Sequence, residues 1–247
     1  MALRIGFDLD GVLADMDSEL VRQSEVLFGA PMTRRLQARA VEAHDAAAAP
    51  DVRSAEDGSP DAAPSVAPLN MTSRQERRLW HHVESIDNFW EGLAELEAGV
   101  IARLASLAIE RRWEIIFLTK RPETAGATAQ VQSQRWLQSK GFTMPSVFVV
   151  QRSRGRIAAA LDLDIVVDDR PENCLDVVTD SRARAILVWR DAEQLLPAAA
   201  RRLGIGVVPL VADCLDILTQ ADSVTREEPG VLERVRRRLG IRESGGT

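Results

Sequence analysis

The chain has 247 residues, of which 45% are hydrophobic and 28% are charged, and its formal net charge is −6. These values are typical of a globular protein with one large domain or two small ones. The negative charge argues against a general nucleic-acid binder, which needs a basic face, and two cysteines are too few for a disulfide framework. No apolar run approaches the roughly 20 residues of a membrane helix, so we expect no membrane and a reduced, cytoplasmic setting.

Six short apolar runs are the candidate strands. Each is rich in Val, Ile or Phe and nearly continuous in apolar character, which is typical of strands buried on both faces of a parallel sheet. They cover residues 3–7, 114–118, 147–150, 165–167, 185–189 and, more weakly, 206–210. Helical patterns lie between them at 100–111, 128–139 and 156–161. This alternation predicts right-handed βαβ crossovers and a doubly wound, Rossmann-like parallel sheet of the α/β class.

The stretch from residue 16 to residue 99 breaks this alternation. Helical patterns at 18–28 and 72–96 flank residues 43–68, which are rich in Ala, Pro, Asp and Ser and have no hydrophobic period. We interpret 16–99 as a helical cap inserted after the first strand, and 43–68 as a mobile segment of that cap. The predicted organisation is an α/β core (1–15 and 100–220), the cap, and a polar C-terminal tail (221–247) with an amphipathic stretch at 231–239.

Two pairs of acidic residues directly follow predicted strands. Asp8 and Asp10 follow the first strand, and Asp168 and Asp169 follow the fourth. Ligands of open α/β sheets bind beyond the carboxyl ends of the strands, so both pairs lie where chemistry is expected. Carboxylates this close repel one another, and Mg²⁺ is the simplest way to offset their charge because it is a hard cation that prefers oxygen ligands.

Hydroxyl and cationic side chains follow the second and third predicted strands. Thr119, Lys120 and Arg121 follow the second strand, and Arg154 and Arg156 follow the third. A hydroxyl group next to cations suits anionic oxygens, which indicates a phosphate group. Lys120 and Arg121 are equally well explained as exposed side chains.

The ordered set of these motifs resembles the haloacid dehalogenase (HAD) superfamily. The chain has DxDGVxxD from Asp8 to Asp15, a threonine after a hydrophobic strand, a basic residue at a helix start, and two aspartates after a later strand. More narrowly, the FDLDGVLAD run that begins at Phe7, and FWEGL followed by AGV, resemble the 5'(3')-deoxyribonucleotidase branch. The resemblance covers roughly residues 1–15 and 100–190, with the insertion in the place of that superfamily's helical cap.

The resemblance implies a catalytic role for each motif. Asp8 would be the nucleophile that forms an aspartyl-phosphate, and Asp10 would protonate the leaving alcohol and then activate water. Thr119 would bind a phosphoryl oxygen, and a cation of the third motif would offset negative charge. The lysine usual in that motif is absent here, so Arg154 is the first candidate for this cation and Arg156 the second.

The resemblance also implies a bound metal ion and a set of substrate contacts. The ion would be Mg²⁺, held by the carboxylate of Asp8, the backbone carbonyl of Asp10 and the carboxylate of Asp168, with Asp169 close by. Aromatic cap residues would pack against the base and sugar of a nucleotide. The candidate substrate contacts are Phe89, Trp90, Lys120 and Arg156.

These motifs together predict one function, with two alternatives. The expected function is a Mg²⁺-dependent phosphomonoesterase that acts through an aspartyl-phosphate on a small phosphate ester, first of all a (deoxy)nucleoside 5'-monophosphate. A phosphatase for another small metabolite, such as a sugar phosphate, is the near alternative. The other is a catalytically silent relative that binds a ligand or a protein partner, although the intact motif residues argue against it. We expect no nucleic-acid polymer as a partner, and the sequence leaves the oligomeric state open.

Overall fold

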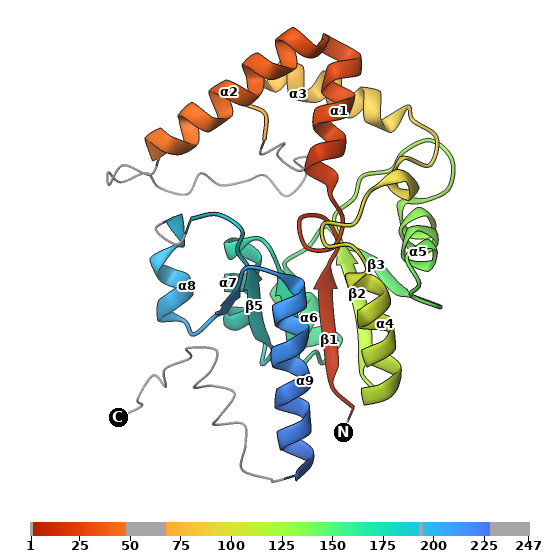
Figure 1. Cartoon of the computed structure of the whole chain (residues 1–247), viewed down its shortest axis with the longest axis vertical. Helices are drawn as coiled ribbons and strands as arrows, with labels where there is room; N and C mark the ends of the chain where they lie inside the picture. The colour runs from red at the N-terminus through yellow and green to blue at the C-terminus, as the bar shows by residue number, and fades with distance from the viewer. Residues whose placement is uncertain (1, 48–67, 193–194, 228–247) are drawn as a thin grey trace.

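The computed structural model of the chain describes residues 2–47, 68–192 and 195–227. Within these residues six parallel strands form one sheet in the order β3-β2-β1-β4-β5-β6 (Figure 1). They are β1 (Arg4–Asp8), β2 (Glu114–Thr119), β3 (Ser146–Val149), β4 (Ile165–Asp168), β5 (Arg184–Val188) and β6 (Gly206–Val208). The predicted doubly wound α/β sheet is confirmed, and each predicted strand is present with slightly shifted ends.

Helices cover both faces of the sheet, and each face has its own apolar core. Successive strand side chains point to opposite faces, so Val167 packs in one core and Val166 in the other. The Val167 face is covered by α4 (Val100–Arg111), α5 (Ala129–Ser139) and α9 (Val211–Glu227). The Val166 face is covered by α6 (Arg154–Ala160), α7 (Pro171–Asp180) and α8 (Ala198–Arg202). Burial on both faces explains why the strand sequences are continuously apolar.

Among the described residues between β1 and α4 there are three helices and a short 3₁₀ helix. They are α1 (Met16–Phe28), α2 (Ala30–Ala47), α3 (Ser73–Glu84) and the 3₁₀ helix η1 (Phe89–Gly92). α1 contacts α2 through a hydrogen bond between the Ser24 and Thr33 hydroxyls at 3.0 Å, and α3 through Gln23 Oε1 and His82 Nε2, also at 3.0 Å. Figure 1 shows these three helices together beyond the carboxyl end of β1.

The chain enters and leaves this helical stretch through two segments that lie side by side. The Asp15 backbone N–H donates to the Ala94 carbonyl at 3.0 Å, and the Leu96 N–H donates to the Leu13 carbonyl at 2.9 Å. These bonds connect the loop after β1 to the segment that precedes α4. The helical stretch is therefore anchored to the sheet next to the two aspartates that follow β1.

The predicted helix at 72–96 is wrong in its second half. α3 ends at Glu84, and Asn88 adopts a left-handed backbone conformation with φ 51°. The Asn88 N–H donates to the Ala125 carbonyl at 2.8 Å, and the Ala125 N–H donates to the Glu84 carbonyl at the same distance. The segment after α3 therefore pairs with the loop before α5, and these contacts replace the helical hydrogen bonds.

The predicted mobile segment at 43–68 and the predicted C-terminal tail lie largely outside the described residues. α2 extends to Ala47, so the first residues of the 43–68 segment are helical and not a loop. The structure does not describe 48–67. α9 continues to Glu227, past the predicted start of the tail, and the amphipathic stretch at 231–239 lies outside the described residues.

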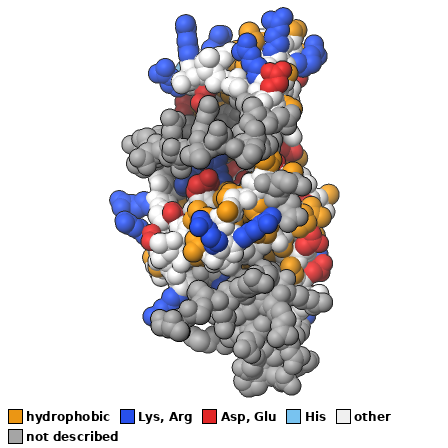
Figure 2. All heavy atoms as spheres, turned by 90° about the vertical axis from the view of Figure 1, so that its left-hand side faces the viewer, with side chains coloured by type: hydrophobic (Ala, Val, Ile, Leu, Met, Phe, Trp, Pro, Cys, Tyr) orange, Lys and Arg blue, Asp and Glu red, His pale blue; other side chains and the backbone are white. Residues whose placement is uncertain are grey.

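Arginines gather on the outer end of the molecule. Figure 2 shows basic side chains along the end that α2 and α3 form. The exposed arginines of these two helices are Arg34, Arg35, Arg39, Arg74, Arg77 and Arg78. The negative net charge of the chain is therefore unevenly distributed, and this end favours anions.

The two cysteines are free and fully buried. Burial raises the pKa of the Cys214 thiol to about 12, and burial together with the nearby Asp168 carboxylate raises the pKa of the Cys174 thiol further still. Both thiols are therefore protonated and unreactive near neutral pH.

None of the described helices has both the length and the apolar character that crossing a membrane requires.

Candidate active site

The four aspartates that the sequence singled out lie at the carboxyl ends of two neighbouring strands. Asp8 ends β1 and is 7% exposed, whereas Asp168 ends β4 and is completely buried. Asp10 and Asp169 follow in the adjoining loops. β1 and β4 pair in parallel, so both ends open at the same edge of the sheet. Carboxylates that are far apart in the sequence are thereby brought together at the position where α/β sheets bind ligands.

The turn after β1 packs closely against the end of β4. Gly11 has a left-handed backbone with φ +80°, and a Cβ atom built on it would lie 2.1 Å from Oδ2 of Asp169. The Leu13 and Ala14 N–H groups both donate to the Leu9 carbonyl at 2.8 Å, which closes the turn. Only glycine combines this backbone conformation with so close an approach.

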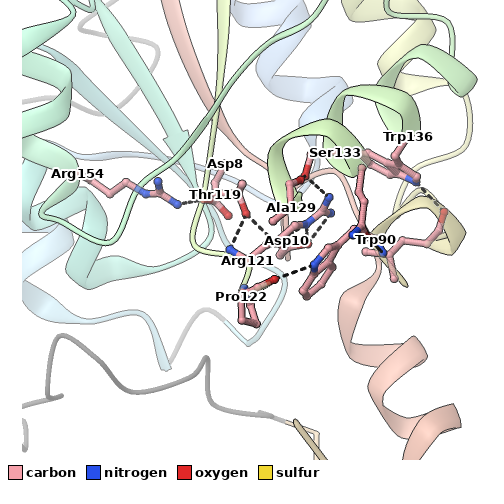
Figure 3. A network of polar contacts seen from close by, with 12 residues as sticks. Asp8, Asp10, Trp90, Thr119, Arg121, Pro122, Ala129, Ser133, Trp136 and Arg154 are labelled. Carbon is pink, nitrogen blue, oxygen red and sulfur yellow. Dashed lines mark hydrogen bonds and ion pairs between the residues drawn. The ribbon is translucent and has the colours of Figure 1, made fainter. Parts of the chain in front are cut away.

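Arg154 is the cation beside the nucleophile candidate. It begins α6, is 2% exposed, and donates from Nη2 to Oδ1 of Asp8 (Figure 3). Its Nε lies 3.4 Å from Oδ2 of Asp168, so one guanidinium group pairs with the aspartates at both strand ends. Arg156 is exposed on the same helix. Of the two arginines that the sequence left open, the structure brings Arg154 to the carboxylates.

A close approach of α6 to α7 allows Arg154 to reach the site. The next residue is Gly155, where a Cβ atom would lie 2.1 Å from the Asp176 carbonyl oxygen of α7. Two buried nitrogens of Arg154, Nε and Nη1, have no hydrogen-bond acceptor among the described residues. A buried donor without an acceptor costs about 1–3 kcal/mol, more when it is charged, so an anionic oxygen bound here would be stabilised.

Asp168 is held by groups that the sequence analysis did not assign. Its Oδ1 accepts from the Arg170 backbone N–H at 2.9 Å, and its two oxygens accept from Nδ2 of Asn173 at 2.9 and 3.1 Å. Asn173 is 9% exposed and lies in the first turn of α7, which begins at Pro171. α7 begins shortly after β4 ends, so the amide of Asn173 in its first turn points back to the end of the strand. The signal in the sequence is an asparagine in the first turn of a helix that closely follows a strand.

Burial and mutual repulsion raise the pKa values of the carboxylates. Burial raises the pKa of Asp8 well above its usual range; Arg154 opposes this, and the neighbouring aspartates add to it. Burial and then Asp168 raise the pKa of Asp169 to about 7 against the opposing charge of Arg170. Burial lowers the pKa of Arg154, but the charges of Asp8 and Asp168 outweigh burial and raise it above its usual value. The site therefore carries more negative charge than its own arginines offset.

This excess charge fits a hard divalent cation. No group of three or more His, Cys, Asp or Glu side chains in the described part of the chain is already gathered around a metal position. Asp8 and Asp168 offer two neighbouring carboxylates, and Mg²⁺ completes its six oxygen ligands with backbone carbonyls and water. The carboxylates of Asp8 and Asp168 therefore fit a hard cation such as Mg²⁺ in their donor chemistry.

A second buried arginine, Arg121, holds the side chain of Asp10 (Figure 3). Nε of Arg121 lies 3.0 Å from each carboxylate oxygen of Asp10, and Nη2 lies 2.7 Å from Oδ1. Thr119 donates its hydroxyl hydrogen to Oδ2 of Asp10 at 3.1 Å and accepts from the Arg121 N–H at 3.2 Å. The Thr119 hydroxyl, for which the sequence predicts a contact with a phosphoryl oxygen, contacts Asp10 in this structure.

Two tryptophans pack against the guanidinium group of Arg121. Its carbon lies 4.9 Å from the ring centroid of Trp90 and 5.5 Å from that of Trp136, which are cation–π distances. Nη1 of Arg121 donates to the Ser133 hydroxyl at 2.9 Å, and Nε1 of Trp90 donates to the Pro122 carbonyl at 3.0 Å. Each side-chain nitrogen of Arg121 therefore has a hydrogen-bond acceptor.

The predicted aromatic substrate contacts are buried in the core. Phe89 and Trp90 are 4% and 0% exposed, and their rings meet edge to face at 4.9 Å. In this conformation neither ring is accessible to a substrate, because η1 turns both inward. Lys120 is exposed, whereas Thr119 and Arg121 on either side of it are buried. From the sequence, Arg121 is a candidate only for a phosphate contact or an exposed position, and its contact with Asp10 is not predicted. The signal for that contact is the two-residue period of a strand, which places Arg121 on the same side as Thr119.

Comparisons with known proteins found similar solved structures only. No protein-family model and no curated protein matches the chain. A phosphonoacetaldehyde hydrolase-like protein from Oleispira antarctica is 14% identical with a TM-score of 0.49, over 99% of this chain and 96% of that one. A HAD family hydrolase from Deinococcus radiodurans R1, solved with bound phosphate and sodium, is 15% identical with a TM-score of 0.44, over 84% and 90%. A hydrolase from Pseudomonas syringae is 15% identical with the same TM-score, over 87% and 98%.

Proposed function

We propose that this protein is a Mg²⁺-dependent phosphomonoesterase that hydrolyses a small phosphate ester through an aspartyl-phosphate on Asp8. The observation that carries the proposal is the contact between Asp8 and Arg154, two of whose buried N–H groups lack an acceptor among the described residues. A phosphoryl group next to Asp8 would meet a carboxylate nucleophile and the buried cation beside it together. Donors already oriented toward developing negative charge are an effective source of transition-state stabilisation.

The proposed reaction divides the chemistry among three side chains. A carboxylate oxygen of Asp8 attacks phosphorus while the bond from phosphorus to the ester oxygen breaks, and Asp10 gives a proton to the leaving oxygen. Asp10 then takes a proton from the water that attacks the aspartyl-phosphate, which releases phosphate and restores Asp8. Arg154 offsets the charge of the phosphoryl oxygens in both steps. Mg²⁺, when bound by Asp8, Asp168 and the Asp10 carbonyl, would supply further charge neutralisation.

The substrate class that we propose first is a (deoxy)nucleoside 5'-monophosphate, and a sugar phosphate is the second candidate. The nucleotide proposal rests on the resemblance of the loop after β1 to the nucleotidase branch. The buried position of Phe89 and Trp90 removes the ring contacts that the same resemblance gave to a nucleotide. We also propose that α1, α2 and α3 act as a cap, because they follow directly from the loop that carries Asp10 and expose arginines that suit an anionic substrate.

The test of the reaction is hydrolysis of p-nitrophenyl phosphate with Mg²⁺ and after its removal by EDTA. We expect Asp8→Asn to lower kcat by at least about a thousandfold, since an amide cannot replace the nucleophile. The matched control is Asp164→Asn, the same substitution before the amino end of β4, where the carboxylate accepts from the Arg4 backbone N–H at 2.8 Å. Equal rates for Asp8→Asn and the wild type, or a rate that does not depend on metal, would contradict the proposal.

A panel of nucleoside monophosphates and sugar phosphates at equal concentrations tests the substrate class. We expect the highest kcat/KM for a nucleoside 5'-monophosphate. If sugar phosphates are hydrolysed as well or better, the nucleotide assignment is wrong while the phosphatase assignment stands. If the wild type hydrolyses no phosphate ester, both assignments fail.

A further inference from the structure

We propose that Arg121 is the positioning residue for Asp10, and that Trp90 and Trp136 fix Arg121 in the orientation that this requires. The inference rests on the proposed function, because it assigns Asp10 to proton transfer. The motifs give Arg121 only as a candidate cation for a phosphate group, and neither they nor the resemblance connect it with Asp10. Arg121 itself touches no reacting atom in this proposal and acts only through the carboxylate of Asp10.

The hydrogen-bond geometry supports this assignment. Nε and Nη2 of Arg121 form a forked contact with the carboxylate of Asp10 at 2.7–3.0 Å. A planar guanidinium group fixes both the position and the rotation of a carboxylate, which the single ammonium group of a lysine does not. The hydroxyl of Thr119 adds a third donor at 3.1 Å. These contacts determine which edge of the carboxylate remains available for proton transfer.

The exposed fractions of Arg121 and Asp10 show which side of the Asp10 carboxylate is open to solvent. The side chain of Arg121 is 0% exposed, while that of Asp10 is 14% exposed. The arginine therefore closes the inner side of the carboxylate, and the remaining exposed part of Asp10 faces away from the core. This arrangement suits a group that must exchange a proton with a substrate or with water on one side only.

The surroundings of Arg121 leave it no alternative orientation. Trp90 and Trp136 pack against the guanidinium group, and Ser133 accepts from the nitrogen that Asp10 does not use. Nε1 of Trp90 is itself bonded to the Pro122 carbonyl at 3.0 Å. A catalytic group must be held within about 0.5 Å of its working position by neighbours that are themselves fixed, and this set of contacts meets that requirement.

The experiment compares two esters that differ in their need for a proton. The p-nitrophenolate anion is a good leaving group and departs unprotonated, whereas the alkoxide of an alkyl phosphate must be protonated as it leaves. In Arg121→Lys and Arg121→Met we expect kcat for an alkyl monophosphate to fall by about 10²-fold, the usual contribution of a general acid. The rate of the pre-steady-state burst of p-nitrophenolate should fall by less than about fivefold, because release of this leaving group in the first step needs no acid. The matched control, Arg4→Lys, alters an ion pair with Glu114 at the opposite end of β1 and should leave both rates unchanged.

The outcomes separate the inference from the proposed function. Equal losses for the burst and for the alkyl ester, in variants with unchanged circular dichroism, would overturn the positioning role and leave the phosphatase assignment intact. If the wild type hydrolyses neither ester, the proposed function fails, and crystal structures of the wild type and Arg121→Met decide the inference alone. The inference then predicts that the carboxylate of Asp10 rotates away or disorders in the variant. An unchanged carboxylate would overturn it.

Discussion

Two buried arginines contact the two aspartates at the carboxyl end of β1 and in the loop after it, and they differ in how completely they are paired. Arg121 uses its side-chain nitrogens on Asp10 and Ser133, and two indole rings pack against it. Arg154 bonds Asp8 through one nitrogen, while its Nε and Nη1 lack an acceptor among the described residues. Both side chains are about equally buried, so the difference lies in their partners and not in their access to water.

This difference distinguishes a residue that supports a site from a residue that binds a ligand. Buried polar groups in native proteins are nearly always paired, and an exception needs a reason. The complete pairing of Arg121 leaves it nothing to offer a substrate, which is why we assign it to the orientation of Asp10. Nη1 of Arg154 has no acceptor among the described residues, and its Nε lies 3.4 Å from Oδ2 of Asp168, which is why we propose that Arg154 binds a phosphoryl group.

Of the substitutions that test this comparison, we expect Arg154→Met to have the largest effect on activity. Arg154→Met should lower kcat/KM by about 10²–10³-fold for p-nitrophenyl phosphate and alkyl phosphates alike, because the lost donors act on the phosphoryl group and not on the leaving group. Arg156→Met, which removes an exposed arginine two residues away on the same helix, is the comparison variant. Steady-state kinetics with both esters measure the effect. A larger loss in Arg156→Met would assign the third-motif cation to the other arginine.

The free energy of unfolding should be lowered more by Arg121→Met than by Arg154→Met, which is the opposite order to the effect on phosphate binding. Arg121→Met should lower the free energy of unfolding by about 3–5 kcal/mol, because it leaves the largely buried carboxylate of Asp10 without its ionic partner. Arg154→Met should cost less than that loss of pairing alone would suggest, because the lost pairing with Asp8 and Asp168 is partly offset by the removal of two buried donors that had no acceptor. Urea unfolding followed by circular dichroism provides both values at one pH. Equal destabilisation by the two substitutions would show that the difference in pairing has no energetic meaning.

A smaller effect is expected at Gly11, with Gly99 as a matched control. Both glycines have left-handed backbones, with φ +80° and +78°, but an added Cβ atom meets Asp169 only at Gly11 and has open space at Gly99. Each alanine substitution should cost about 1–2 kcal/mol of backbone strain. Only Gly11→Ala should displace Asp169 and raise the Mg²⁺ concentration for half-maximal activity, by about tenfold. Parallel Mg²⁺ titrations of the two variants measure this, and identical curves would remove Asp169 from the site.

The sheet could be predicted from the sequence because its signal is local and repeated. Apolar strands, each followed by a helical pattern, fix a parallel α/β sheet, and parallel strands bring their carboxyl ends to one edge. The position of the aspartates follows from the strands alone. The helix predicted at 72–96 was wrong because its apolar residues continue past Glu84, while the backbone at Asn88 pairs with a loop more than 30 residues further along the chain.

The partners of Asp10 could not be predicted for a related reason. Strand alternation places Arg121 on the side of Thr119, but nothing local states that two tryptophans from η1 and α5 will cover it. The resemblance to the nucleotidase branch gives Trp90 a substrate contact, because aromatic cap residues of that branch pack against the base and sugar. The tertiary contact with Arg121 decides its role, and that contact depends on how the chain returns from α3 to the core.

The position of Trp90 has a consequence for protein engineering. Trp90 belongs to η1, between α3 and the return of the chain to α4, so the residue that packs on Arg121 comes from the stretch inserted after β1. A displacement of α1, α2 and α3 that moves η1 would change the environment of Arg121 and with it that of Asp10. Ligand binding that displaces those helices would then change how Arg121 orients Asp10. A chimaera that exchanges these helices with those of another protein therefore has to keep η1 from this chain, with the junction placed before Asn88.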